Sequence, residues 1–178
     1  RLFRSHDLEI VHVEHLAIHG GSIRIHAMPT GAEPVRESVK SLLAEEAEWV
    51  DDAASYASFG QRVENLRTEL TGLLSQLKAD NKRVAVYGAS AKGSTLLNYF
   101  GIGQDQIDHV VDRSTIKQGH YTPGTHLKIY DPRRLTADQP DYCLLLTWNF
   151  AEEILAQQKK YRDQGGQFII PIPEIKVA

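Results

Sequence analysis

The chain has 178 residues, with 20 lysines and arginines against 23 aspartates and glutamates, and its formal net charge is -3 at neutral pH. This balance gives no reason to expect nucleic acid or a membrane surface as a partner, because both attract an excess of positive charge. The hydrophobic share of 42% is ordinary for a globular protein. No apolar run approaches the roughly 20 residues that span a bilayer.

The only cysteine, Cys143, lies in the apolar run Cys-Leu-Leu-Leu. A single cysteine cannot form an internal disulfide, so we expect a buried thiol in a reducing compartment and a cytoplasmic protein. The chain begins at Arg1 within a sequence pattern and shows no signal peptide. It is therefore expected to be a fragment of a longer protein.

Residues 8–28 predict a β-hairpin. Apolar and polar residues alternate on both sides of His19-Gly20-Gly21-Ser22, as expected for two strands around a glycine turn. Pro29, Gly31 and Pro34 then break regular structure. We assign residues 1–32 to this hairpin lead-in.

Helical periodicity follows. Apolar residues recur at steps of three and four from Val35 to Ala57, and a second apolar stripe runs from Val63 to Leu77. Gly60 separates the two stripes, and Ser58 is available as an N-cap for the second. We expect two amphipathic helices within the helical segment 35–79.

From residue 82 onward, apolar strands alternate with helices. Strands are expected at 83–87, 107–111, 142–146 and 167–170, with a short apolar stretch at 127–130 and helices at 95–100 and 150–161. Nearly continuous apolar strands separated by helices favour a parallel sheet covered on both faces. The predicted fold class is therefore α/β, a Rossmann-like doubly wound and mostly parallel sheet with flanking helices. It is preceded by the hairpin and the two amphipathic helices, and residues 33–178 form the Rossmann-like C-terminal domain.

The loop from Gly88 to Gly93 follows the first predicted strand and leads into a helix. Ligands bind at this edge of α/β sheets, and the free N–H groups of a helix N-terminus favour an anion such as phosphate. Lys92 could add a positive charge. The loop is not a P-loop, because Lys92 precedes the second glycine, and Ser90 stands where G-x-G-x-x-G needs its middle glycine. Phosphate or nucleotide binding and plain turn chemistry both remain open.

Other polar and aromatic residues fall at the same edge. Asp112 ends the second strand, where a Rossmann acidic residue would bind ribose. Trp148 could stack on a base or pack internally, and Asn149 could bind ligand or cap the next helix. Lys117 and Tyr121 lie on a long loop, and such loops are often functional. The substrate-binding candidates are Gly88, Ala89, Ser90, Lys92, Gly93, Asp112, Lys117, Tyr121, Trp148 and Asn149.

No catalytic residue and no metal site is predicted. Five of the eight histidines lie near the start of the chain: His6, His12, His15, His19 and His26. There is no H-E-x-x-H motif, and His12 and His15 on one strand face opposite sides. Neither Ser22 nor Ser90 lies in a G-x-S-x-G elbow.

Five stretches resemble the C-terminal domain of the SAM-dependent sugar C-methyltransferases, a family that methylates a carbon of nucleotide-linked keto-deoxysugars. They are "HGGSIR" (19–24), "VYGASAKGSTLLNYFGI" (86–102), "VVDRSTIKQGHYTPGTHLKI" (110–129), "LLLTWNF" (144–150) and "GGQFIIPIPE" (165–174). They occur in the family's order, and the "KQGHYTPGTH" block is the most specific.

The resemblance implies a nucleotide-linked sugar as the ligand, with its diphosphate at Gly88 to Gly93. The family's SAM-binding domain and zinc module would lie elsewhere in a full-length chain, and residues 1–32 would be the tail of the SAM domain. This fragment would bind no cofactor and would be inactive alone, because the family's Tyr and Glu-His acid/base residues have no counterpart. The Glu14-His15 pair is not assigned that role.

Two other hypotheses remain. One is an NAD- or CoA-binding Rossmann domain of an oxidoreductase or ligase. The other is a non-catalytic assembly module whose glycine loop binds nothing.

Overall fold

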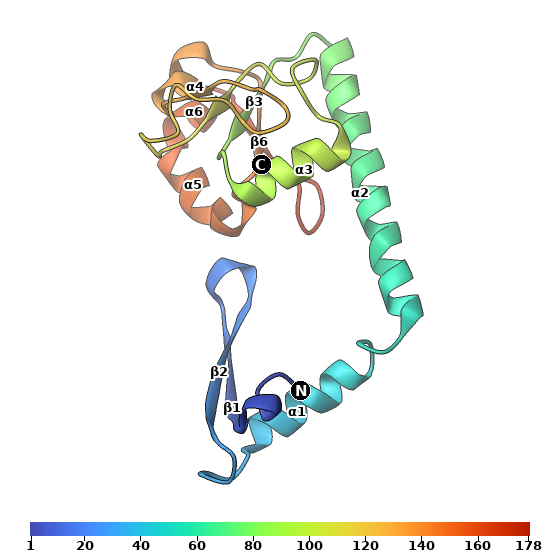
Figure 1. The fold of residues 1–178 in the computed structure, drawn as a ribbon. Coiled ribbons are helices and arrows are strands. Elements are labelled where there is room, and N and C mark those ends of the chain that lie inside the picture. The colour runs from blue at the N-terminus through green and yellow to red at the C-terminus, as the bar shows by residue number, and fades with distance from the viewer. The chain divides into compact units, whose positions relative to one another are not determined.

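The computed structural model describes all residues from 1 to 178, and they form two compact units, Arg1–Gln61 and Arg62–Ala178 (Figure 1). The division falls within helix α2 (Ala53–Ala79). It lies later than the boundary after residue 32 predicted from the sequence, because helix α1 (Glu37–Ala47) packs against the hairpin.

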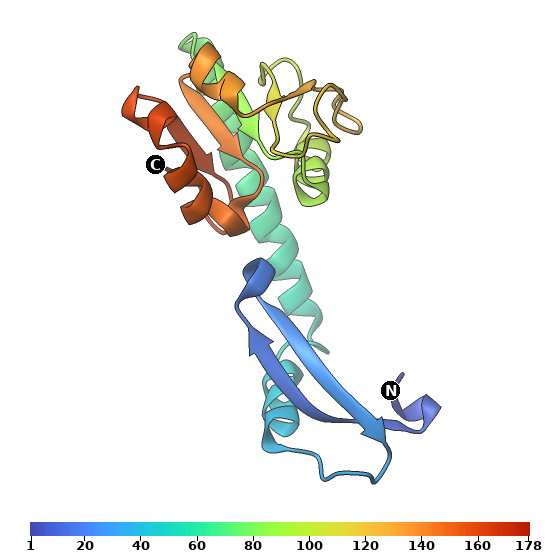
Figure 2. The same ribbon diagram turned by 90° about the vertical axis from the view of Figure 1, so that its left-hand side faces the viewer.

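The first unit contains the expected hairpin, whose strands are drawn in blue in Figure 2. A short 3-10 helix, η1 (Arg4–His6), precedes strand β1 (Leu8–Leu16), which pairs antiparallel with β2 (Ser22–Pro29). The turn between them contains η2 (Ile18–Gly20). Gly20 and Gly21 have φ angles of +82° and +110°, which is why glycines stand there.

Helix α1 is fixed to β1 by backbone and side-chain hydrogen bonds. The Arg36 amide donates to the Val11 carbonyl at 2.9 Å, and the Ser38 hydroxyl accepts from the Val13 amide at 3.3 Å. Val11, Val13 and Val39 are buried. These contacts make the hairpin and α1 one packed unit.

The break between the first two helices lies at residues 48–52, so the break predicted at Gly60 was wrong. The Asp52 carboxylate accepts hydrogen bonds from the amides of Ala54 at 3.1 Å and Ser55 at 3.0 Å, and so begins α2. Gly60 has open space around it and is accommodated inside the helix. Ser58 therefore lies within α2 and does not cap it.

The second unit is built on a six-stranded sheet in the order β5-β4-β3-β6-β7-β8. All neighbouring pairs are parallel except β7 with β8. The predicted strands are present, although the second is shorter than expected, and β8 was not predicted. The strands are β3 (Val84–Tyr87), β4 (Val110–Val111), β5 (Ile129–Tyr130), β6 (Tyr142–Leu145), β7 (Gln167–Ile170) and β8 (Lys176–Val177).

Helices cover both faces of this sheet. One face packs on α2 and α3 (Ala91–Phe100) through residues such as Val86, Leu144 and Leu97. The other face, with Ala85 and Leu145, packs on the remaining helices. These are α4 (Arg133–Asp138), α5 (Ala151–Gln157) and α6 (Lys159–Asp163), with the 3-10 helix η3 (Trp148–Phe150) before α5.

This is a mixed α/β architecture with a mostly parallel central sheet and flanking helices, as predicted. The single helix expected at 150–161 is divided into α5 and α6. None of the helices combines the length and apolar character needed to cross a membrane.

Candidate functional site

A cavity of about 260 Å³ opens where β3, β4 and β6 end. These strands are parallel, so their carboxyl ends meet at one edge of the sheet. The order of the strands also reverses between β3 and β6, which is where ligands bind in open α/β sheets. The residues that line the cavity include Tyr87, Gly88, Asp112, Arg113, Thr147 and Phe150.

Gly88 lines this cavity and cannot be replaced without strain. Its φ angle is +97°, and a Cβ atom there would lie 2.6 Å from Thr147 Cγ2. Its amide donates to the Val111 carbonyl at 2.8 Å. Glycine is thus required at this position by its positive φ angle and by the nearby Thr147 side chain.

Asp112 fixes the shape of the glycine loop. Its Oδ2 accepts from the Ala89 amide at 2.7 Å, and its Oδ1 accepts from the Ser114 amide at 2.8 Å. Lys117 Nζ lies 3.5 Å from the same Oδ2 and donates to the Ala89 carbonyl at 2.9 Å. Two predicted ligand contacts, Asp112 and Lys117, therefore form hydrogen bonds with the backbone of the glycine loop.

Ser90 and Gly93 shape the N-terminus of α3. The Ser90 hydroxyl accepts from the Gly93 amide at 3.0 Å, which is an N-cap hydrogen bond. A Cβ at Gly93 would lie 2.6 Å from Leu146 Cβ, so this glycine allows α3 to pack closely on the sheet. The amides of Ser90, Ala91 and Lys92 have no partner within the protein. These three N–H groups are the ones that can bind an anion.

Lys92 and Trp148 lie together at the same end of α3. The Lys92 ammonium group is 5.3 Å from the centroid of the Trp148 ring, a cation–π geometry. The two predicted candidates are thus brought together although they are far apart in the sequence. Asn149 follows Trp148 in η3, directly before Phe150, the N-cap residue of α5.

Lys92, Trp148 and Asn149 do not line the cavity, and neither does Tyr121. It lies on the loop after β4, pairs with Lys128 in an isolated β-bridge, and is 58% exposed. Neither the cavity lining nor the hydrogen bonds of the glycine loop include it.

Several cavity residues were not among the predicted candidates. Burial raises the pKa of the Tyr87 hydroxyl, and the opposing effects of Arg113 and Gln158 are smaller. Arg113 Nη1 lies 3.2 Å from Gln157 Oε1 and 3.5 Å from Glu153 Oε1. Arg113 and Thr147 each lie two residues after the end of a strand, β4 and β6, a signal that would have identified them. Phe150 and Glu153 come from the helical layer, whose placement the sequence pattern does not specify.

Residues 17–173 match the family described as the C-methyltransferase C-terminal domain. The chain belongs to this family. The matched range of this C-methyltransferase C-terminal domain includes the glycine loop, the cavity and all strands of the sheet except β8. The resemblance predicted from the five sequence stretches is confirmed.

The domain is also similar to the C-methyltransferase NovU of Streptomyces niveus. The two are 41% identical over 178 residues, which covers 99% of this chain and 42% of NovU. The chain therefore spans less than half the length of that relative. An enzyme-associated methyltransferase domain is the identity that these similarities support.

Proposed function

We propose that this C-methyltransferase C-terminal domain binds a nucleotide-linked keto-deoxysugar and positions it for SAM-dependent methyl transfer to carbon. The observation that carries the proposal is the group of three unpartnered amides, Ser90 to Lys92, at the N-terminus of α3. They belong to the loop whose first residue, Gly88, lines the cavity. Three N–H donors at the positive end of a helix suit the negative charge of a diphosphate.

The topology supports a Rossmann-like interpretation of the sheet. Counted from β3, the strands lie in the order 3-2-1-4-5-6, which is the order of doubly wound nucleotide-binding sheets. The glycine loop follows the first of these strands, as a phosphate-binding loop does in such folds. We therefore assign the diphosphate to the loop and the nucleoside or sugar to the adjoining cavity.

Trp148 and Lys92 would complete this site. The Trp148 ring offers a flat apolar surface on which a base or sugar ring can stack. Lys92 lies over that ring and could also neutralise one phosphate oxygen. Lys92 carries one of the three free amides and its ammonium group lies over the Trp148 ring, so we expect one ligand to contact all of them.

The chemistry itself would require groups that we assign to other parts of a full-length enzyme. A base would remove the proton beside the keto group, and the resulting enolate carbon would attack the methyl group of SAM. This domain would contribute by holding the sugar nucleotide in place, which lowers the entropic part of the barrier. We expect the fragment alone to transfer no methyl group. The buried free thiol of Cys143 accords with a reducing, cytoplasmic setting.

Calorimetric titration tests the proposal. A nucleoside diphosphate and a nucleotide-linked sugar should bind saturably, whereas SAM should not bind. Preferential binding of NADH or coenzyme A would favour a dinucleotide- or CoA-binding domain instead. No binding of any phosphorylated ligand would favour an assembly module.

A further inference from the structure

We infer that His12, Glu14 and His26 of the hairpin form a binding site for Zn²⁺ or a similar first-row divalent transition metal ion. The three side chains lie in the first unit and are independent of the nucleotide site proposed above. Their nitrogen and carboxylate oxygen atoms all lie within 4.8 Å of one another.

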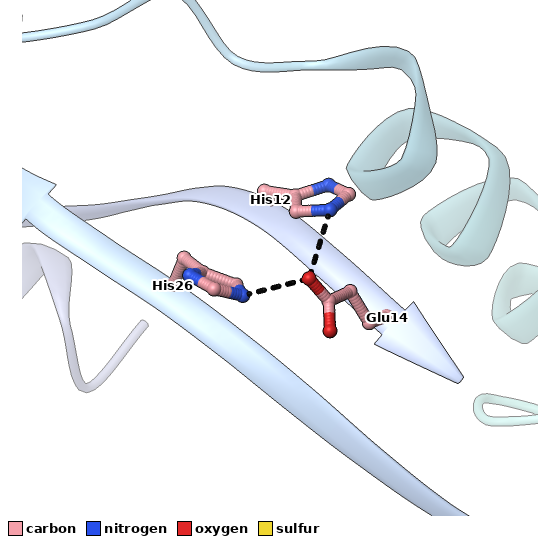
Figure 3. A group of neighbouring side chains, drawn as sticks. All are labelled: His12, Glu14 and His26. Atoms are coloured by element: carbon pink, nitrogen blue, oxygen red, sulfur yellow. Dashed lines mark ion pairs between the residues drawn. The ribbon is translucent and has the colours of Figure 1, made fainter. Parts of the chain in front are cut away.

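The register of the hairpin brings these residues together. His12 and Glu14 are two positions apart on β1, so they project from the same face. His26 on β2 is paired with His12 and is diagonal to Glu14. Figure 3 shows the Glu14 carboxylate pointing between the two imidazole rings, one from each strand. His15, which projects from the other face, is not part of the group.

The distances suit ligands of one metal ion. Glu14 Oε1 lies 3.5 Å from His12 Nε2 and 3.2 Å from His26 Nε2. Two ligands about 2.0–2.1 Å from a tetrahedral Zn²⁺ are separated by about 3.3–3.4 Å. The oxygen and the two nitrogens can therefore surround an ion with small rotations of the side chains.

Ser38 contacts the His12 ring at Nδ1, the nitrogen that does not face Glu14. Its hydroxyl oxygen lies 2.7 Å from His12 Nδ1 and is itself fixed by the Val13 amide. The hydroxyl oxygen can accept a hydrogen bond from Nδ1–H, which leaves the lone pair of Nε2 directed at the metal. Hydrogen bonds of this kind orient histidine ligands in known metal sites. Ser38 is therefore a positioning residue of the proposed site.

Arg24 determines which carboxylate oxygen is free. Its Nη1 lies 3.1 Å from Glu14 Oε2, whereas both histidines face Oε1. Glu14 would thus bind the ion through one oxygen, with the other held by the guanidinium group.

Two imidazoles and one carboxylate select the class of ion. This set suits Zn²⁺, Cu²⁺, Ni²⁺ or Co²⁺ and is a poor match for Mg²⁺ or Ca²⁺, which prefer oxygen ligands. The side chains of His12, Glu14 and His26 are 24%, 36% and 45% exposed, so an ion could enter from solvent and retain an open coordination position. Because the ligands come from both strands, the ion would join β1 to β2.

The test is a calorimetric titration of the tag-free chain with ZnCl₂, repeated with MgCl₂. We expect one saturable Zn²⁺ site per chain and no saturable Mg²⁺ binding. His26→Ala should abolish the Zn²⁺ site, and Ser38→Ala should weaken it about 10–100-fold. His15→Ala is the matched control, since it removes a histidine from the same strand but the opposite face, and it should bind Zn²⁺ as the unaltered chain does.

Substitution with Co²⁺ gives a second readout, because visible absorption bands report nitrogen and oxygen ligands in a four-coordinate site. The bands should be lost in His26→Ala and kept in His15→Ala, with circular dichroism confirming that both variants are folded. Equal Zn²⁺ binding by the unaltered chain and His26→Ala would overturn the proposal. So would the absence of saturable binding in the unaltered chain, or its loss in His15→Ala.

Discussion

The Asp112 carboxylate accepts a hydrogen bond from the Ala89 amide at 2.7 Å, and so ties the end of β4 to the loop that follows β3. The same carboxylate accepts from the Ser114 amide at 2.8 Å. One side chain therefore determines the shape of both loops beside the cavity. The amides of Ser90 to Lys92, which follow Ala89 in the chain, have no partner because a helix offers no acceptor to its first N–H groups.

Asp112→Ala should lower the free energy of unfolding of the second unit by about 1–3 kcal/mol, because two backbone N–H groups lose their acceptor. Urea unfolding followed by Trp148 fluorescence, in a Trp49→Phe background, reports on this unit alone. Asp112→Asn retains one acceptor oxygen and should be less destabilised. A stable Asp112→Ala protein that has lost only ligand affinity would show that Asp112 contacts the ligand and does not shape the loop.

Lys92→Ala should weaken binding of a nucleoside diphosphate by about 1 kcal/mol, roughly fivefold, at low salt. The loss should shrink at about 0.5 M salt, because an exposed charge is screened by ions. Lys128→Ala is a matched control, since Lys128 also lies over an aromatic ring, 5.4 Å from the Tyr130 centroid, on another part of the sheet. Equal losses in both variants, or a loss independent of salt, would contradict a direct role for Lys92.

Gly93→Ala should destabilise the second unit by about 1–3 kcal/mol, because the added methyl group would collide with the buried Leu146 side chain. Gly72→Ala should have the opposite effect, a gain of about 0.5–1 kcal/mol, because Gly72 lies in α2 with nothing near its Cβ position. Thermal melting should show a lower melting temperature for Gly93→Ala and a higher one for Gly72→Ala than for the unaltered chain. A neutral Gly93→Ala variant would mean that α3 does not pack closely on β6.

The buried His109 should make stability depend on pH. Burial, with a further effect of Arg134, lowers the pKa of His109 in the folded protein. The unfolded chain then takes up a proton at higher pH than the folded one, so stability is lost as the pH falls from about 6.5 toward the lowered value.

Melting temperatures of the unaltered chain and His109→Gln between about pH 5 and about pH 7.5 test this effect. The difference in melting temperature between the two proteins should be constant above about pH 6.5. At lower pH the unaltered chain should lose more melting temperature than His109→Gln. A difference that is the same at every pH would show that His109 does not titrate across this range.

Much of the second unit could be predicted from the sequence because most residues of its central strands are apolar and buried. Val84–Tyr87 and Gln167–Ile170 were located by this signal. The edge strand Lys176–Val177 is exposed and carries no such pattern. The break at residues 48–52 was missed because an Asp52 cap is a stronger determinant of helix ends than an exposed glycine at position 60.

The sequence was sufficient to predict which loops meet at the candidate site, but not the contacts that their side chains make. The glycine loop and Asp112 follow strand ends, and parallel strands bring those ends together. The use of Asp112 and Lys117 to hold the loop depends on side-chain geometry that spacing does not contain. The His12–Glu14–His26 group could have been found by counting outward from the turn, since the pairing of Leu16 with Ser22 also pairs His12 with His26.

The central claim is that the free amides at the start of α3 bind the diphosphate of a nucleotide-linked sugar, and amide chemical shifts test it most directly. Nitrogen–proton correlation spectra of the labelled chain should be recorded during titration with a nucleoside diphosphate, with the parent nucleoside as control. The account predicts saturable shifts at Ser90, Ala91 and Lys92 that require the phosphates. Saturation without movement of these three signals, or equal shifts with the nucleoside alone, would contradict it.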